Sequence, residues 1–335
     1  MYTIADEERA SGSIHTNKLA AIVDDIAVQG FAVVADLVSE ETRRLLMDSV
    51  REDAEAIRAT EELTPHEKHT GVGHLQLGLR RRAPYVRPDL LANPLIEHIV
   101  LGVLGEYAWL GFYNGNVNMP GSTSQPLHFD RPFTWKTEEE AFAAGESWPP
   151  RATTLSCSVA LEEITVANAA TEIYPGSHRE TAVTSWPRGE RPGTHPELLE
   201  KWGPPVRMEI PAGGVCFRDP RMWHRGMPNT SSRLRPMIAM TFHAALGKHW
   251  RGTLVRGLAS EDITQLETDA SLRVMDDRTL GDGRLVFEES GRSVFDEHPS
   301  RHCIDRNVRF VRKLDHTVDA HLVGGARVLE ESGSA

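Results

Sequence analysis

The stretch that decides the fold is residues 125–130, with the sequence Gln-Pro-Leu-His-Phe-Asp. His128 and Asp130 stand two residues apart, and on a β-strand such residues point to the same face. An imidazole and a carboxylate on one face can bind one divalent first-row metal ion, while Phe129 turns into the opposite layer. Alone, this pattern is more typical of a surface or salt-bridged pair, because about one His-x-Asp is expected by chance in a chain with 15 histidines.

A second stretch, residues 219–229, adds a histidine and leads to an arginine. A turn and a short predicted strand come before His224, and Arg235 follows after a turn with the sequence Pro-Asn-Thr-Ser. We expect Arg235 on the strand adjacent to His224, where its fork of donors would match a carboxylate. With His128 and Asp130, His224 would complete the two-histidine, one-carboxylate ligand set of a catalytic iron(II) site. Arg235 would hold an acidic co-substrate beside that metal.

The composition argues against several classes of partner. The chain has 335 residues, 40% of them hydrophobic, which is enough for one large domain or two small ones. Its formal net charge of −11 argues against a nucleic-acid or anionic-membrane partner. No apolar run approaches the roughly 20 residues that span a bilayer, and the acidic N-terminus does not resemble a signal peptide. We therefore expect a cytoplasmic protein without a membrane partner.

The cysteines support the same compartment. Cys157, Cys216 and Cys303 are odd in number and far apart along the chain. This pattern favours a reducing cytosol without a disulfide framework. Cys157 and Cys216 lie in apolar runs, so we expect them to be small core residues.

Two amphipathic helices are expected near the N-terminus. Apolar residues recur at helical spacing over 19–26, and Gly30 ends that pattern. Residues 31–34 are typical of a short buried strand. Ser39 is the predicted N-cap of a second helix, whose apolar stripe covers 46–57.

From about residue 105 the sequence changes to short apolar runs broken by Gly, Pro and Asn. Many short strands separated by turn signals are typical of a β-sandwich or barrel. The predicted fold class is therefore mainly β with flanking α, a barrel buttressed by the N-terminal helices. The candidate strands are 109–114, 153–161, 171–174, 206–210, 214–218, 222–225 and 236–244.

Three segments lie outside this predicted core. Residues 134–150 and 185–205 are long and polar, and such loops inside a compact domain often serve as lids or binding loops. Residues 255–335 form a C-terminal extension that packs on the barrel or at an oligomer contact, and its secondary structure stays open. We expect a single domain over 1–335 with its core at about 20–250.

Four features of the chain occur together in one known family. They are the 125–130 stretch, the sequence Asn-Ala-Ala-Thr at 168–171 running into Pro-Gly-Ser-His at 175–178, then His224 and Arg235. Their order and spacing resemble the phytanoyl-CoA dioxygenase-like branch of the iron(II)/2-oxoglutarate-dependent dioxygenases. Ala169 departs from the pattern, because the family usually has glycine there, which alters the turn locally.

The resemblance implies a double-stranded β-helix, a jelly-roll barrel with the metal near its open end. The three ligands named above would hold iron(II), and Arg235 would bind the distal carboxylate of 2-oxoglutarate. Gln125 and Thr171 match positions that help to hold this co-substrate in relatives. His178 is expected to be a structural turn residue and not a ligand.

The family chemistry consumes 2-oxoglutarate and dioxygen, releases succinate and carbon dioxide, and oxidises a C–H bond of a small molecule. Asp130 argues against a halogenase, because related halogenases lack this carboxylate and so leave space for chloride. Hydroxylation is the expected outcome, while desaturation and epoxidation stay open. The Gln-Pro-Leu-His sequence is closer to members that modify natural products, so we expect a natural-product intermediate as substrate.

Residues close to the predicted metal site are candidates for substrate contact. Arg131, Phe133 and Trp135 follow the first two ligands, and Gln76 precedes the barrel at a position that often forms pocket wall in relatives. The arginine run 80–82 is more often a solvated face, although it could meet an acidic substrate group. Phe133 and Trp135 could equally be members of the hydrophobic core without contact to the substrate.

Two other functions stay open. A catalytically idle barrel could bind metal and act as a small-molecule sensor or scaffold, although Arg235 speaks against it. A zinc-dependent hydrolase could use the same three ligands with Glu172 as general base. For the dioxygenase as for either alternative, a homodimer that covers the open end of the barrel stays open.

Overall fold

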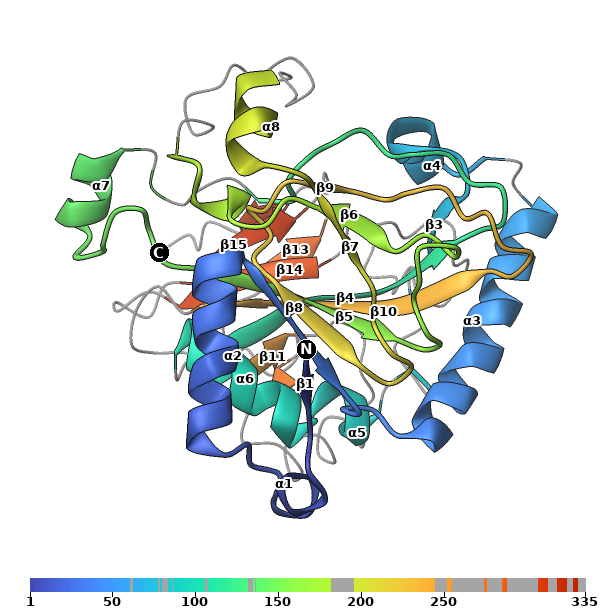
Figure 1. Cartoon of the computed structure of the whole chain (residues 1–335), viewed down its shortest axis with the longest axis horizontal. Helices are drawn as coiled ribbons and strands as arrows, with labels where there is room; N and C mark the ends of the chain where they lie inside the picture. Colours follow the sequence, from blue (N-terminus) through green and yellow to red (C-terminus); the bar gives the residue numbers. More distant parts are fainter. Residues whose placement is uncertain are drawn as a thin grey trace.

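The computed structural model of the chain describes residues 1–60, 63–77, 79, 84–85, 87–105, 108–131, 135, 137–181 and 196–244, and six strands between 252 and 330. Its main element is a nine-stranded, largely antiparallel sheet (Figure 1). In spatial order the strands are β1 (Tyr2–Thr3), β2 (Phe31–Ala35), β8 (Val215–Arg218), β5 (Thr154–Ala160), β10 (Arg235–His243), β4 (Trp109–Asn118), β11 (Gly252–Leu254) and β12 (Val274–Met275), with β3 (His74–Gln76) also paired to β4.

A smaller sheet packs against the large one. Its order is β7 (Val206–Met208), β6 (Thr171–Ile173) and β9 (His224–Arg225). Apolar side chains fill the space between the two sheets, among them Ala160 and Cys216 from the large sheet and Ile173 and Met208 from the small one. Two packed antiparallel sheets form the jelly roll of a double-stranded β-helix. The predicted mainly-β fold is confirmed.

Helices cover the other side of the large sheet. Helices α2 and α6 share one hydrophobic core with β2, β5 and β8, so the N-terminal part buttresses the sheet as predicted (Figure 1). The described helices are α1 (Asp6–Ser11), α2 (Thr16–Gln29), α3 (Glu40–Thr60), α4 (Pro65–Thr70), α5 (Pro88–Leu91), α6 (Pro94–Leu104), α7 (Glu138–Ala143), the 3-10 helix η1 (Ser177–Arg179) and α8 (Pro196–Trp202).

The local signals for the two predicted helices are borne out. Ile22 and Ile26 are fully buried on α2, and Gly30 ends that helix with a left-handed φ of 88°. A side chain on Gly30 would also collide with Met222. The hydroxyl of Ser39 accepts a hydrogen bond of 3.2 Å from the backbone N–H of Thr42, as an N-cap does.

The predicted strands from residue 109 onward are present with shifted ends, but the stretch around the first ligands differs. Residues 125–130 form no regular strand, and His128 makes a single β-bridge to His224. Prolines 126 and 220 stand in the two facing segments, and a proline cannot donate to a ladder, so the pairing stays short. The expected strand 222–225 is reduced to the two residues of β9.

Two predicted loops contain helix. Helix α7 lies inside 134–150, where Thr137 accepts a hydrogen bond of 3.2 Å from the N–H of Glu140 and caps it. Helix α8 occupies 196–202 of the described part, 196–205, of the second loop. Trp186 lies outside the described residues, whereas Trp202 packs on Trp223 with ring centroids 5.8 Å apart. Cys157 and Cys216 are buried core residues, as expected, and Cys303 lies outside the described part.

The described parts of the C-terminal extension are strands. β11 joins the large sheet beside β4, β13 (Leu285–Phe287) pairs with β16 (Val328–Glu330), and β14 (Asn307–Arg312) pairs with β15 (Val318–Val323). The expected oligomer contact and the single domain over 1–335 stay predictions. Among the residues that the structure describes, no helix combines the length and apolar character needed to cross a bilayer.

The N-terminal helices give a first prediction, on stability alone. The carboxylate of Glu8 is buried and accepts hydrogen bonds of 2.9 Å from the backbone N–H groups of Ala5 and His15, as well as one from Lys18. Burial raises the pKa of Glu8, but the bonds from Lys18 and the backbone outweigh it and lower the pKa to about 2. We expect Glu8→Gln to reduce the free energy of unfolding by about 2 kcal/mol at pH 7.

The pH dependence identifies the cause. Because the folded pKa is depressed, the contribution of Glu8 is fully present above its unfolded pKa of about 4.5 and is lost as pH falls toward 2. Denaturant unfolding at a series of pH values should therefore show the gap between wild type and Glu8→Gln closing below pH 4.5. Glu7→Gln, at an exposed side chain, is the matched control. A gap that is independent of pH would contradict the prediction.

Candidate metal centre

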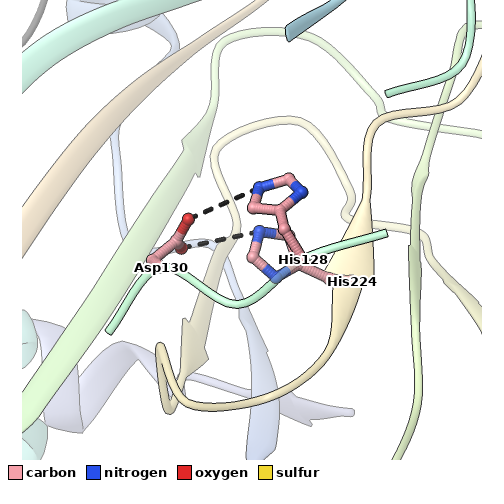
Figure 2. A group of neighbouring side chains, drawn as sticks. All are labelled: His128, Asp130 and His224. Carbon is pink, nitrogen blue, oxygen red and sulfur yellow. Dashed lines mark ion pairs between the residues drawn. The ribbon is translucent and has the colours of Figure 1, made fainter. Parts of the chain in front are cut away.

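His128, Asp130 and His224 meet at one point in the structure (Figure 2). Their ligand atoms all lie within 4.8 Å of one another. Nε2 of His128 is 3.6 Å from Oδ1 of Asp130, and Nε2 of His224 is 3.5 Å from Oδ2 of the same carboxylate. Two imidazoles and one carboxylate on a common point match the facial ligand set of mononuclear iron(II), which leaves further positions open.

The backbone fixes this meeting of two distant segments. The N–H of His128 donates to the carbonyl of His224 at 2.9 Å, and the N–H of His224 donates back at 2.8 Å. The N–H of Asp130 donates to the carbonyl of Pro220 at 2.9 Å. Three backbone bonds among four residues therefore hold both histidines and the carboxylate in place before any metal binds.

Hydrogen bonds also set which nitrogen of each histidine is free. Nδ1 of His128 lies 2.7 Å from the carbonyl oxygen of Pro126, and Nδ1 of His224 lies 3.0 Å from that of Met222. A carbonyl can only accept, so each Nδ1 carries the proton and each Nε2 keeps its lone pair for a metal. Nη1 of Arg218 lies 3.3 Å from Nδ1 of His224, but a protonated nitrogen cannot accept from it.

The electrostatics keep the triad in its metal-binding charge state. Burial raises the pKa of Asp130, but His224, Arg218 and His128 outweigh it and hold that pKa well below its usual range. Burial, with Arg218, lowers the pKa of His224 to about 3. The side chain of Asp130 is nonetheless 40% exposed, because it faces an open cavity. A charged carboxylate and a neutral imidazole are therefore presented to that cavity at neutral pH.

Arg218 is a site residue that the sequence did not predict. It lies at the end of β8, is 7% exposed, and its Nη2 donates to Oδ2 of Asp130 at 2.6 Å. This bond restricts the carboxylate, so that Oδ1 is the better-placed ligand atom and Asp130 would bind the metal through one oxygen. A charged residue ending the apolar run Val215–Phe217 on the face between the sheets was the signal available in the sequence.

Removal of this clamp gives a second prediction. We expect Arg218→Met to weaken iron(II) binding by about 10- to 100-fold, as the loss of groups that orient metal ligands typically does. Arg218→Lys should lose less iron(II) affinity than Arg218→Met, because lysine keeps a charged donor. Competition with a chelator for iron(II), under anoxia, measures both constants. Arg151→Met removes an exposed arginine that pairs with Glu146 and is the control. Unchanged affinity in a folded Arg218→Met protein would contradict the clamp.

Arg235 lies in the same cavity with its charge uncompensated. It is 4% exposed, its Nη2 donates to the carbonyl of Ala169 at 3.2 Å, and its Nε has no hydrogen-bond partner. Among the described residues, none brings a carboxylate within ion-pair distance of it. Burial lowers the pKa of Arg235 to about 10, while the more distant Glu162 opposes this shift. A buried guanidinium is costly unless paired, so this arrangement fits an anionic ligand.

The expected position of Arg235 was wrong in one respect. Arg235 starts β10 of the large sheet and pairs with Asn118, whereas His224 is in the small sheet. The two residues are therefore not on adjacent strands. In a jelly roll, consecutive strands change sheet, so the turn between them carries the chain across the barrel. The two side chains still line one cavity from opposite layers.

Gln125 and Thr171 also line this cavity. Oε1 of Gln125 accepts from the N–H of Gly226 at 2.9 Å, which leaves its amide NH₂ as the remaining side-chain donor. Thr171 is nearly buried on β6. Ala169 has a left-handed φ of 75°, which explains why glycine is usual there, and its carbonyl contacts Arg235. The turn thus positions the arginine.

The cavity has a volume of about 490 Å³ and two distinguishable ends. Residues pair across the large sheet in rows, and one row joins His74, Asn118 and Arg235. Another row joins Thr241, Ser156 and Arg218. Six residues along β10 separate the two rows, which is about 20 Å at 3.3 Å per residue. The metal ligands come from the facing segments near the Arg218 end, where Arg218 bonds to Asp130 and lies 3.3 Å from Nδ1 of His224.

The substrate candidates divide into three groups. Gln76 and Arg131 line the cavity, as predicted. Trp135 is half-buried and is not among the lining residues, so no contact places it at the cavity. Phe133 and the arginine run 80–82 lie outside the described residues. Burial lowers the pKa of Arg131, although Asp130 opposes this effect.

Two further histidines bear on the site. His178 is buried, contacts the carbonyl of Ala27 at 3.0 Å through Nε2 and is not among the residues that line the cavity, which agrees with a structural role. His74, which the sequence did not single out, lies in the row of Arg235, and burial lowers its pKa. A neutral imidazole beside Arg235 leaves that arginine as the charge at this end of the cavity.

Comparisons with known proteins agree with the geometry. The sequence model of the phytanoyl-CoA dioxygenase (PhyH) family matches residues 26–237. Dioxygenase af480 of Aspergillus fumigatus is 26% identical over 161 residues, 47% of this chain and 44% of that protein. Dioxygenase trt7 of Aspergillus terreus is 29% identical over 165 residues, 48% of this chain and 50% of that protein. The chain thus spans about half the length of the curated relatives it matches.

A solved structure supports the fold. AviO1 from Streptomyces viridochromogenes aligns with a TM-score of 0.51 and 18% identity, covering 71% of this chain and all of that one. The expected enzyme class and its iron(II), 2-oxoglutarate and dioxygen are those of the matched family, and the two-histidine, one-carboxylate site fits that metal. Since the family match covers more than half of its length, this chain belongs to the phytanoyl-CoA dioxygenase family.

Proposed function

We propose that this protein is an iron(II)/2-oxoglutarate-dependent dioxygenase that hydroxylates a C–H bond of a small molecule. The observation that carries the proposal is the buried guanidinium of Arg235, which has no carboxylate partner among the described residues and lies in the cavity that also holds the metal triad. A metal site alone fits many functions, whereas a metal site with a carboxylate-binding group at one end fits a dicarboxylate co-substrate.

Each residue has a role in this proposal. His128, Asp130 and His224 hold iron(II) and leave three positions open. Arg235 binds the distal carboxylate of 2-oxoglutarate, and Gln125 and Thr171 bond to the same molecule from neighbouring segments. When bound, iron and 2-oxoglutarate supply the oxidising chemistry that turns dioxygen and a C–H bond into an alcohol, succinate and carbon dioxide. The side chains around them orient both reactants and exclude bulk water.

The metal triad also bears on the type of oxidation. Asp130 occupies the ligand position that a halide would need, and Arg218 anchors it there by a bond of 2.6 Å. This supports a halide-free oxidation. The cavity, at about 490 Å³, has room for a molecule larger than 2-oxoglutarate beside the metal. We therefore propose a natural-product intermediate of moderate size as the substrate.

The two alternatives are disfavoured by particular contacts. An idle metal-binding barrel has no need for Arg235, whose burial without a counter-ion costs stability. For a zinc hydrolase, Glu172 would have to reach the metal. Its Oε1 instead accepts from Nε of Arg225 at 2.7 Å, and Glu172 is not among the residues that line the cavity. On β6 it points to the opposite side from Thr171.

A two-stage experiment tests the proposal. Under anoxia, adding 2-oxoglutarate to the iron(II)-loaded protein should give a visible charge-transfer absorption, and admitting air should then convert 2-oxoglutarate to succinate. Zinc(II) in place of iron should give neither. Iron binding without 2-oxoglutarate binding would favour the idle barrel, and metal-dependent hydrolysis under strict anoxia would favour the hydrolase. A homodimer, the cytoplasmic location and the absence of a nucleic-acid partner stay predictions from the sequence.

A further inference from the structure

The charges around the cavity are strongly unequal. Among the described residues that line it, the only carboxylate belongs to Asp130, whereas three guanidinium groups belong to Arg131, Arg218 and Arg235. Arg218 is paired with Asp130 at 2.6 Å. If Arg235 binds 2-oxoglutarate, as proposed above, Arg131 is the lining arginine left without an anion. A half-buried guanidinium in a partly apolar cavity is stabilised by an anionic partner.

Arg131 is held firmly but only through its backbone. Its N–H donates to the carbonyl of Pro220 at 3.2 Å, beside the bond from Asp130 to the same oxygen. Its side chain is half-buried and has no hydrogen bond or ion pair to any described residue. Asp130 attracts it, but that carboxylate already binds Arg218 and faces the metal position. As far as the described residues go, the guanidinium of Arg131 is therefore available to a ligand.

The position of Arg131 separates it from the co-substrate. The segment 125–131 runs along the cavity, with Gln125 bonded to Gly226 at one end and Arg131 bonded to Pro220 at the other. Gly226 lies against His74, which is in the row of Arg235. Pro220 follows Arg218, whose row is about 20 Å away along the strand. Arg131 thus lies at the end of the cavity opposite to Arg235.

We propose that Arg131 binds a carboxylate of the substrate that is to be oxidised. This contact orients the substrate at the metal. This inference rests on the proposed function and adds the chemical class of the substrate, a carboxylic acid with an apolar body. A bidentate arginine–carboxylate pair fixes both position and orientation. Phe112 supplies apolar wall nearby, and Ser156 and Thr241 supply hydroxyl groups. The contact with Arg131 would place the apolar body of the substrate between the Arg131 end and the Arg235 end of the cavity.

The test uses matched acids and amides as probes. The protein is first saturated with iron(II) and 2-oxoglutarate under anoxia, so that the Arg235 end is filled and no turnover occurs. Equilibrium dialysis then measures binding of phenylacetate, 3-phenylpropionate and 4-phenylbutyrate, each against its primary amide. We expect the best acid to bind at least tenfold more tightly than its amide. Arg131→Gln should reduce that preference to within twofold.

Controls separate this inference from the proposed function. Arg131→Gln should leave the affinity for 2-oxoglutarate within twofold of wild type, and Arg151→Gln, at an exposed arginine that pairs with Glu146, should leave the acid preference intact. Equal binding of acids and amides, no binding of any acid, or a preference that survives in Arg131→Gln contradicts the inference. A tenfold loss of 2-oxoglutarate affinity in Arg131→Gln would make Arg131 a co-substrate ligand instead.

Two further outcomes are informative. Tighter binding of 2-phenylethyl phosphate than of every acid would assign a phosphate ester and overturn the carboxylate. Failure of wild type to bind 2-oxoglutarate at all would contradict the proposed function itself, and it is seen before any probe is added. Absence of an acid preference in the wild-type protein, with normal 2-oxoglutarate binding, contradicts only the role of Arg131.

Discussion

Replacing His224 by alanine is expected to weaken iron(II) binding by more than about 100-fold and to abolish 2-oxoglutarate turnover. Changes to groups that merely orient a ligand already cost about 10- to 100-fold, and His224 would be a ligand itself. The remaining pair, His128 and Asp130, would hold a metal through two atoms only. Titration with cobalt(II), followed by its visible absorption, measures affinity independently of activity.

Two further variants and a thermal unfolding measurement distinguish the loss of a metal ligand from the loss of the fold. His224 is buried, so alanine leaves a cavity, and thermal unfolding must show that the variant is folded. His128→Ala removes a ligand whose side chain is 38% exposed, so it should lose metal at a smaller cost in stability. His15→Ala, at an exposed histidine, should bind cobalt normally. Normal cobalt affinity in folded His224→Ala would remove the metal centre from the proposal.

How far the sequence could predict this site depends on the range of each signal. Spacing of two residues put His128 and Asp130 on one side, because that is a local property of extended chain. The meeting with His224 needed the order of features along the chain, which resembled a known family. The relation of His224 to Arg235 was predicted wrongly, because a turn does not reveal whether the next strand stays in the same sheet. Only the three-dimensional arrangement shows the crossing between sheets.

Arg218 and helix α7 show a second limit. An arginine after an apolar run is usually read as the end of a strand, and its bond to Asp130 spans 88 positions of sequence. No local pattern predicts such a pair. Helix α7 begins with three glutamates after a Thr cap, a start signal that was present, but its short length hid it among polar residues. The sequence therefore predicts the metal ligands better than the residues that support them.

Arg235→Gln is expected to raise the dissociation constant of 2-oxoglutarate by about 100-fold while leaving iron(II) affinity unchanged. Truncating one partner of a buried, hydrogen-bonded charge pair typically costs about 2–5 kcal/mol, and about 3 kcal/mol corresponds to this factor. The row of Arg235 is removed from the metal ligands, so the triad should be unaffected. The anoxic charge-transfer absorption, titrated with 2-oxoglutarate at saturating iron(II), gives the constant directly.

The stability of the same variant distinguishes a binding residue from a structural one. In the protein without co-substrate, Arg235 is a buried cation without a paired carboxylate among the described residues, and burial lowers its pKa to about 10. Glutamine removes that unfavourable charge, so we expect the unfolding temperature to stay equal or rise. Arg233→Gln, two positions away at an exposed side chain, should alter neither property. A structural arginine would give the opposite result, with lower stability and 2-oxoglutarate affinity lost only in proportion to unfolding.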